Sequence, residues 1–313
     1  MNHQMILSFG EALWDLLPTG EVLGGAPFNF AYRAHSLGCD SLMISRLGND
    51  DYGRRAMDQI TGLGMDKRLV QWDEERPTGT VQIELDAHNQ PDYFIVPNAA
   101  YDRIELTDEM LVLAAQAKCI CFGTLAQREE GSRATLLRLL DEMQGKIKLL
   151  DINLRKECYS TKIITQSLDK ATMVKLNEDE APYLSGLFSL PENIPDFCAA
   201  MIERWALSYC VITLGDKGVF AASADGAARY APGFQIELAD PCGAGDAFTA
   251  GFIDRLFRGK ALSECCRFGN ALGALVAAQP GATVPVSLDE IQIFLDSNPV
   301  ELIDESLQDY RMG

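Results

Sequence analysis

Histidine and basic residues are scarce in this sequence, and the cysteines show no metal-binding spacing. With three histidines and nine cysteines that form no CxxC pair, neither a structural zinc site nor a disulfide framework is expected. The 27 basic residues are outnumbered by 45 acidic ones, which gives a formal net charge of −18. A charge of this sign argues against a general nucleic-acid binder or a membrane-surface binder.

Long apolar runs are absent as well. No stretch approaches the roughly 18 residues that a membrane-spanning helix needs. The first residues lack the basic start and long apolar core of a secretion signal, and an odd number of scattered cysteines suits a reducing compartment. We therefore expect a cytoplasmic protein with neither a nucleic-acid nor a membrane partner.

Two common nucleotide-binding fingerprints are missing. No GxxxxGK[ST] loop occurs, because Gly259-Lys260 is followed by Ala261, and no GxGxxG follows the first predicted strand. The sequence therefore has no P-loop. It also lacks the glycine fingerprint of a dinucleotide oxidoreductase, although such an enzyme would share the sheet architecture predicted below.

Short apolar runs alternate with helical patterns over most of the 313 residues. The predicted strands are 5–9, 41–45, 119–122, 147–152, 172–176 and 210–214. The predicted helices are 29–37, 53–62, 132–143 and 194–205. This alternation predicts one α/β domain over residues 1–313, with a mostly parallel sheet covered by helices on both faces.

Two segments, at about 12–24 and 77–101, break this alternation. Their residues alternate as in hairpin strands, with turn residues between the two halves. Such insertions suggest a small accessory sheet that serves as a lid or a dimer surface. Two surface hairpins without a role are the equally open alternative.

The segment Asp240-Pro241-Cys242-Gly243-Ala244-Gly245-Asp246 carries the strongest chemical signal. Small residues allow a tight turn in which successive N–H groups converge, and the helical pattern that follows adds a positive helix end. Negative charge can develop at such a place, and a carboxylate in the first turn can accept a proton from an alcohol. Taken alone, the string is also compatible with a Gly-rich loop whose Asp merely favours a helix start.

A second signal lies near the N-terminus. Gly24-Gly25 lets a ligand approach the backbone closely, and Asn29 at a helix start offers both a donor and an acceptor. Together with Asp15 these groups suit sugar hydroxyls. The simpler interpretation is a turn followed by a helix cap.

Taken in order, these motifs resemble a known family. The sequence runs Gly-Gly-x-x-x-Asn, Asp-x-Asn-x-Arg at 151–155, Asn-x-x-Glu at 177–180, Thr-Leu-Gly-x-x-Gly at 213–218 and Asp-x-x-Gly-Ala-Gly-Asp at 240–246. This resembles the ribokinase-like (PfkB) sugar kinases over essentially the whole chain, and bacterial fructokinases most of all. The resemblance implies a three-layer α/β/α sandwich with a small β-sheet lid.

The resemblance also implies roles. Asp246 would be the catalytic base, and the amides of Gly243, Ala244 and Gly245 would hold the transferring phosphoryl group. The implied sugar-binding residues are Asp15, Gly24, Gly25, Asn29 and Arg155. The implied ATP-binding residues are Asn177, Thr213, Gly215, Gly218 and Asn270. The implied metal residue is Glu180, which would hold Mg²⁺ through water.

The implied activity is ATP-dependent phosphorylation of a free sugar, with D-fructose first. A kinase for 2-keto-3-deoxygluconate, ribose or a nucleoside is the alternative, and a catalytically silent sugar sensor belongs to a different class. Pro241-Cys242 stands where relatives usually carry Thr. Many relatives bind K⁺ near this loop and the segment matching 279–284, so K⁺ is a possible cofactor. Lid sheets of relatives often pair two chains, so we expect a homodimer.

Overall fold

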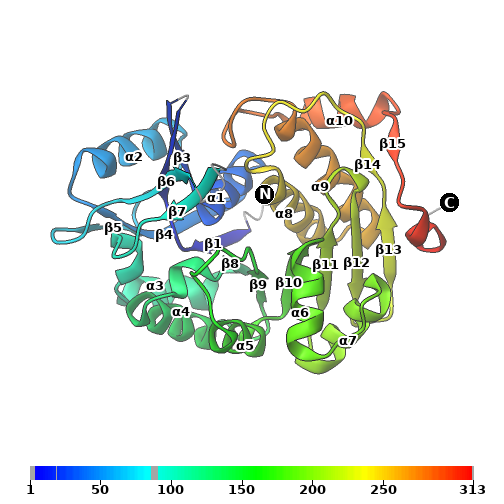
Figure 1. Cartoon of the computed structure of the whole chain (residues 1–313), viewed down its shortest axis with the longest axis horizontal. Helices are drawn as coiled ribbons and strands as arrows, with labels where there is room; N and C mark the ends of the chain where they lie inside the picture. Colours follow the sequence, from blue (N-terminus) through cyan, green and yellow to red (C-terminus); the bar gives the residue numbers. More distant parts are fainter. Residues whose placement is uncertain (1–3, 19, 86–90, 312–313) are drawn as a thin grey trace.

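Nine strands lie side by side in the centre of the computed structural model, which describes residues 4–18, 20–85 and 91–311 (Figure 1). In spatial order they are β13 (Ala228–Ala231), β12 (Val219–Ser223), β11 (Tyr209–Thr213), β10 (Met173–Asn177), β9 (Ile147–Asp151), β8 (Cys119–Phe122), β1 (Met5–Phe9), β4 (Asp40–Gly48) and β5 (Val70–Asp73). The pairing is parallel from β5 to β11. β12 and β13 form an antiparallel edge.

Helices cover both faces of this sheet, as predicted (Figure 1). One face packs against α3 (Asp108–Gln116), α4 (Glu130–Glu142), α5 (Thr161–Lys170), α6 (Glu180–Phe188) and α7 (Ile194–Trp205). The other packs against α1 (Ala26–Ser36), α8 (Ala244–Phe257), α9 (Leu262–Ala277) and α10 (Leu288–Asp296). Successive strand residues face opposite helix layers. Leu7 belongs to the core beneath α3–α7, and Ile6 to the core beneath α1 and α8–α10.

The predicted elements are confirmed with small shifts of their ends. The strand predicted at 172–176 is β10, which begins and ends one residue later, so Asn177 is its last residue. The helix predicted at 29–37 begins at Ala26, because Pro27 fits the first turn of a helix. The antiparallel edge formed by β12 and β13 was not predicted.

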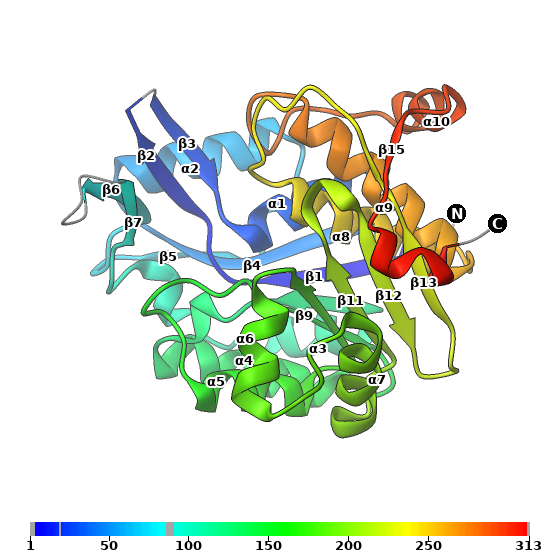
Figure 2. The same cartoon turned by 45° about the vertical axis from the view of Figure 1, so that its right-hand side comes forward.

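The two predicted insertions meet in one small sheet. Its order is β3 (Gly20–Gly24), β2 (Leu13–Leu17), β6 (Gly79–Leu85) and β7 (Pro91–Ile95). β2–β3 and β6–β7 are antiparallel hairpins, and β2 and β6 pair in parallel between them. Figure 2 shows this sheet standing out from the central sheet beside α2 (Asp51–Gly62). The tips of both hairpins, at residue 19 and residues 86–90, lie outside the described residues.

The short elements complete the chain. They are β14 (Gly233–Phe234) and β15 (Glu301–Leu302), which pair with each other, and the 3₁₀ turns η1 (Ala100–Arg103), η2 (Leu125–Gln127), η3 (Gly215–Lys217) and η4 (Glu305–Tyr310). All nine cysteines are free thiols. Within the described residues, no helix has the length and apolar character needed to cross a membrane.

The fold gathers the predicted motifs at one edge of the sheet. β1, β9, β10 and β11 run parallel, so their carboxyl ends open on the same side. The loops that follow these strands carry the motifs at 10–15, 151–155, 177–180 and 213–218. Helix α8 begins at the same edge, where Asp246 meets α1.

Candidate active site

The start of α8 depends on the glycine that precedes it. Gly243 has a φ of 75°, in the left-handed region. A Cβ placed on Gly243 would lie 2.4 Å from the Cβ of Ala282, so a side chain has no room there. The Ala244 N–H donates to the Pro241 carbonyl (3.2 Å) and is already engaged in the turn. The N–H groups of Gly245 and Asp246 lie in the first turn of the helix, where no intrahelical acceptor is available.

Asp246 is joined to α1 by a hydrogen bond between segments 217 residues apart in the sequence. The Asn29 Nδ2 donates to Asp246 Oδ2 at 2.9 Å. Asn29 is buried, and its Oδ1 has no hydrogen-bond partner among the described residues. The structure therefore brings together Asn29, which was predicted to bind the sugar, and Asp246, which was predicted to be the catalytic base.

Burial raises the pKa of Asp246 from its ordinary value of 3.8 to about 6. The negative charge of Asp151 raises it further, whereas Lys175, the Asn29 hydrogen bond and Arg155 lower it. A carboxyl group with this pKa is ionised at neutral pH and still basic enough to take up a proton.

Behind the start of α8 lies a buried ion pair that the sequence analysis did not identify. Lys175 Nζ lies 3.2 Å and 3.1 Å from the two carboxylate oxygens of Asp151. The two residues are direct partners in the parallel pairing of β9 and β10, and both side chains are buried. A Cβ placed on Gly245 would lie 3.3 Å from Lys175 Nζ, so the ammonium group faces the first turn of α8.

Neighbouring carboxylates keep the Lys175 side chain protonated. Burial alone would lower its pKa, but the carboxylates of Asp151, Glu180 and Asp246 raise it above its usual value. The signal in the sequence was a lysine placed between apolar residues of a central strand, Met-Val-Lys-Leu-Asn. A charged side chain is rarely buried in such a strand without a partner.

The residues predicted to bind the sugar lie on the other side of Asp246 from the ion pair of Lys175 with Asp151. Gly24 leaves room for a carboxylate, since a Cβ there would lie 3.0 Å from Asp15 Oδ2. Gly25, with a φ of 113°, packs so closely that a Cβ would lie 2.5 Å from the Glu11 carbonyl. Burial raises the pKa of Asp15. Arg155 is exposed, and its positive charge lowers the pKa of both Asp15 and Glu11.

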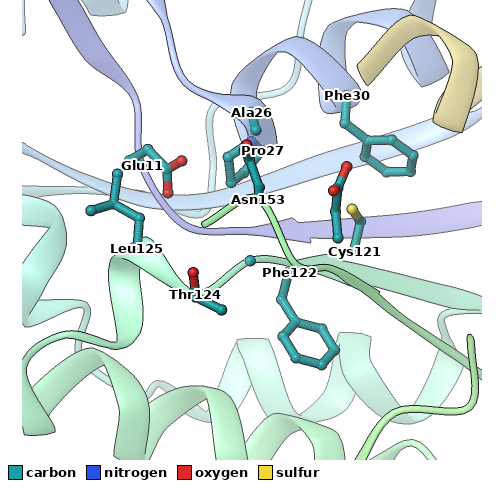
Figure 3. A pocket seen from close by; sticks show the side chains of 11 residues that line it. Glu11, Ala26, Pro27, Phe30, Cys121, Phe122, Thr124, Leu125 and Asn153 are labelled. Carbon is teal, nitrogen blue, oxygen red and sulfur yellow. The ribbon is translucent and has the colours of Figure 1, made fainter. Parts of the chain in front are cut away.

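A hollow lies beneath these residues, between the start of α1 and the ends of β1 and β8 (Figure 3). Glu11, Thr124 and Asn153 are among the side chains that line it. Burial raises the pKa of Glu11 to about 7. Asn153 has a φ of 44°, a conformation that non-glycine residues adopt mainly where the surroundings impose it. Neither residue was assigned a role from the sequence.

Glu180 joins two of the motif loops. Its Oε1 accepts from the Leu154 N–H (2.7 Å) and its Oε2 from the Asn177 N–H (2.9 Å). The side-chain oxygen of Asn177 in turn accepts from the N–H groups of Asp179 and Glu180. The described residues contain no group of three or more His, Cys, Asp or Glu side chains that could hold a metal ion. The carboxylate of Glu180 beside Asn177 fits an Mg²⁺ ion held through water and phosphate, because Mg²⁺ takes few protein ligands.

The residues predicted to bind ATP form a second group beside the first. Thr213 Oγ1 donates to the Leu176 carbonyl (3.2 Å), and Thr213 pairs with Asn177 across the two strands. Gly215 has a φ of 58°, and a Cβ there would lie 2.9 Å from Glu178 Oε1. The loops after β10 and β11 are therefore in contact.

Gly218 and Asn270 shape the wall behind these loops. Gly218 has a φ of 98°, and a Cβ there would lie 2.1 Å from the Ala231 carbonyl oxygen. The Asn270 Nδ2 donates to the carbonyls of Ala231 (3.0 Å) and Pro232 (2.9 Å). Both amide hydrogens of Asn270 thus hold the segment against which Gly218 packs.

The comparisons with known proteins agree on one family. The sequence model described as pfkB family carbohydrate kinase matches residues 18–289. Fructokinase-1 of Zea mays is 28% identical over 323 residues, which cover 93% of this chain and 98% of that protein. Fructokinase of Klebsiella pneumoniae is 29% identical over 256 residues, which cover 78% of this chain and 81% of that protein.

A solved structure is similar over nearly the whole chain. The crystal structure of fructokinase from Vibrio cholerae O395, in its fructose, ADP and calcium ion bound form, has a TM-score of 0.79 and is 25% identical. The similarity covers 93% of this chain and 99% of that one.

Proposed function

This chain belongs to the pfkB family of carbohydrate kinases, and we propose that the acceptor in its phosphotransfer reaction is a hydroxyl group of D-fructose. The predicted ribokinase-like α/β/α fold is confirmed. The names of the relatives and the Asp-x-Asn-x-Arg motif that ends in Arg155 support fructose. The observation that carries the proposal is the hydrogen bond between Asn29 and Asp246 at the start of α8.

In the proposed reaction Asp246 is the general base. Its carboxylate removes the proton of the acceptor hydroxyl as the hydroxyl oxygen bonds to the γ-phosphorus of ATP. The bond between that phosphorus and the β–γ bridging oxygen breaks, and ADP leaves with the electron pair. Asn29 orients the carboxylate through its hydrogen bond, and Asp15 with the Gly24-Gly25 backbone would bind other hydroxyls.

The phosphoryl group would be held at the first turn of α8. The free N–H groups there, the positive end of the helix and the Lys175 ammonium all favour negative charge in one place. Because the Ala244 N–H donates to Pro241, we assign this role to the amides of Gly245 and Asp246 together with Gly243. The contribution of Lys175 is an addition to the prediction from sequence.

ATP and Mg²⁺ would bind beside the loops at 177–180 and 213–218. When bound, Mg²⁺ neutralises phosphate charge. Glu180 would hold it through water, since both of its oxygens already accept backbone hydrogen bonds. Gly215 and Gly218 would let the nucleotide lie against the backbone, with Asn270 supporting the wall behind it.

We expect the activity to be independent of K⁺. The resemblance left K⁺ as an open alternative near residues 279–284, where backbone carbonyls would bind it. In this chain the Ala282 carbonyl already accepts a hydrogen bond from the Arg33 guanidinium at 2.5 Å. A fixed positive charge therefore lies against one carbonyl of this segment, and it would repel a second cation bound there.

The small sheet is proposed to be a lid whose closure excludes water from the transfer. We also propose that the protein is a cytoplasmic homodimer. The nine free thiols suit a reducing compartment, and light scattering after size exclusion would measure the number of chains.

A panel of acceptors tests the function. Coupled ADP release would be measured with ATP, Mg²⁺ and fructose, ribose, 2-keto-3-deoxygluconate or a nucleoside, with and without K⁺, using Asp246→Asn as the blank. We expect the highest kcat/KM for fructose. Selective activity on another acceptor would replace fructose, and ATP-dependent turnover of none would favour a sugar-binding sensor.

A further inference from the structure

Arg33 on α1 is a fully buried charged side chain whose role is not explained by the reaction described above. Its exposed fraction is 0%, and no carboxylate forms an ion pair with it among the described residues. Its Nε and Nη1 have no hydrogen-bond partner there. A guanidinium group buried in this way loses its hydration without gaining a counter-charge in contact, which is costly.

Arg33 places its guanidinium over the Tyr32 ring, 5.1 Å from the ring centroid, and makes a hydrogen bond that leads to the proposed phosphoryl site. Its Nη2 donates to the Ala282 carbonyl at 2.5 Å. The side chain of Ala282 packs against the Gly243 turn, as the 2.4 Å separation from a Cβ on Gly243 shows. Asp240 ties the same two segments together, because its carboxylate accepts from the N–H groups of Cys242 (2.9 Å) and Gly281 (3.1 Å).

Helix α1 thus supports the start of α8 at two points. Asn29 and Arg33 are four residues apart and share one face of the helix. Asn29 holds the Asp246 carboxylate, and Arg33 holds the loop on which the Gly243 turn rests. A displacement of Arg33 would reach the turn through Ala282.

The charge of Arg33 also acts on this site. Burial lowers the pKa of Arg33, and electrostatic interactions with the neighbouring Tyr32 and with the Asp246 carboxylate oppose that effect. Asp246 is therefore near enough to interact with the guanidinium without touching it. An anion at the first turn of α8 would interact favourably with the same uncompensated charge.

We propose that Arg33 is a positioning residue for phosphoryl transfer, which fixes the Gly243 turn through Ala282 and supplies a buried positive charge behind the phosphoryl group. This inference rests on the proposed function. On this proposal, the negative charge of the transferring phosphoryl group is the counter-charge that the buried guanidinium otherwise lacks.

The test compares Arg33→Met and Arg33→Lys with Arg46→Met. Arg46 is a matched control, because it is a mostly buried arginine paired with Asp73, away from α8. Each variant is measured for kcat, for KM of sugar and of ATP, for the pH dependence of kcat/KM and for Tm. The charged and polar groups near Asp246 in the pH measurement are Glu11 after β1, Asn29 and Arg33 on α1, Asp151 and Arg155 at and after the end of β9, Lys175 on β10 and Cys242 before α8.

We expect Arg33→Met to lower kcat by about 10–100-fold, since a small misplacement of reacting groups costs up to about 100-fold. KM for the sugar should change by less than about threefold. The acid limb of kcat/KM should move to higher pH, because a positive charge near Asp246 is lost. Arg33→Lys retains the charge but not the planar donor group, so its limb should stay in place while kcat falls less.

A purely structural role would lower Tm in Arg33→Met and Arg46→Met alike and leave kcat per folded molecule and the acid limb unchanged, which would overturn the proposal. If Arg33→Met does not fold, Arg33→Lys decides, because a wild-type kcat in that variant would refute positioning through Ala282. Failure of the proposed function is distinct, since the wild-type protein would then turn over no sugar with ATP.

Discussion

Replacing Asp246 by Asn should abolish most activity and at the same time stabilise the protein. Asparagine cannot accept the proton of the acceptor hydroxyl, so kcat should fall by about 10²–10⁴-fold. The amide keeps an oxygen for the Asn29 Nδ2 and adds a donor that can pair with the unpartnered Asn29 Oδ1. Sugar binding should therefore change little.

The stability gain follows from the raised pKa of Asp246. The difference between the ordinary value of 3.8 and about 6 corresponds to about 3 kcal/mol, and solvent screening at this partly exposed residue reduces it to about 1–3 kcal/mol. The folded pKa is the higher one, so the folded state binds the proton more tightly. The ionised carboxylate accordingly destabilises the fold as pH rises from about 4 to 6, and fully above about 6.

Chemical and thermal denaturation of wild-type protein and Asp246→Asn at several pH values measure this effect. Above about pH 6.5 the variant should be more stable, with a Tm higher by a few degrees, and the difference should vanish near pH 4. Asp58→Asn on the exposed face of α2 is the control for loss of one negative charge. A variant no more stable than wild type at pH 7.5, or one with wild-type turnover, would refute the reasoning.

The other predictions concern the charges and the turn around this carboxylate. Kinetic pH profiles should show wild-type kcat/KM falling below about pH 6. Lys175→Met should move this acid limb to higher pH and lower kcat, because the variant loses a cation that lowers the pKa of Asp246. An acid limb that stays in place would contradict this effect. Gly243→Ala should lower both Tm and kcat, since the new Cβ meets a neighbour at 2.4 Å. Gly226 has a φ of 90° and open space around it, so the control variant Gly226→Ala should show only backbone strain of about 1 kcal/mol. Equal losses of Tm in the two variants would exclude the steric explanation. Arg155→Met should raise KM for the sugar in steady-state assays more than it lowers kcat, and the reverse pattern would assign Arg155 to the transfer step.

The sequence predicted the layers of the fold well because its signals are local. Short apolar runs and helical periodicity reveal buried strands and their covering helices without reference to distant residues. The edge strands β12 and β13 escaped prediction because they are short and rich in alanine, which has no preference for strands. The two insertions were identified, but their parallel pairing through β2 and β6 depends on the tertiary fold.

The residues predicted for the site are those that motifs mark locally, such as a carboxylate after Gly-Ala-Gly at a helix start. Lys175, Asp151 and Arg33 were not assigned roles because their significance lies in pairing and burial. Lys175 and Asp151 become partners only through the register of β9 and β10. The contact of Arg33 with Ala282 joins residues 249 positions apart. No spacing within one segment indicates either contact.

These buried charges explain how one carboxylate can remain a usable base. Asp151 and Lys175 carry opposite charges, so they act on the pKa of Asp246 in opposite directions. Burial then raises its pKa, and the Asn29 hydrogen bond limits the rise. The pair is nevertheless oriented, with its ammonium group toward Gly245. In the proposed reaction the same arrangement keeps Asp246 basic while it presents positive charge to the phosphoryl group. An isolated lysine at this position could not do both, because it would lower the pKa of the proposed base.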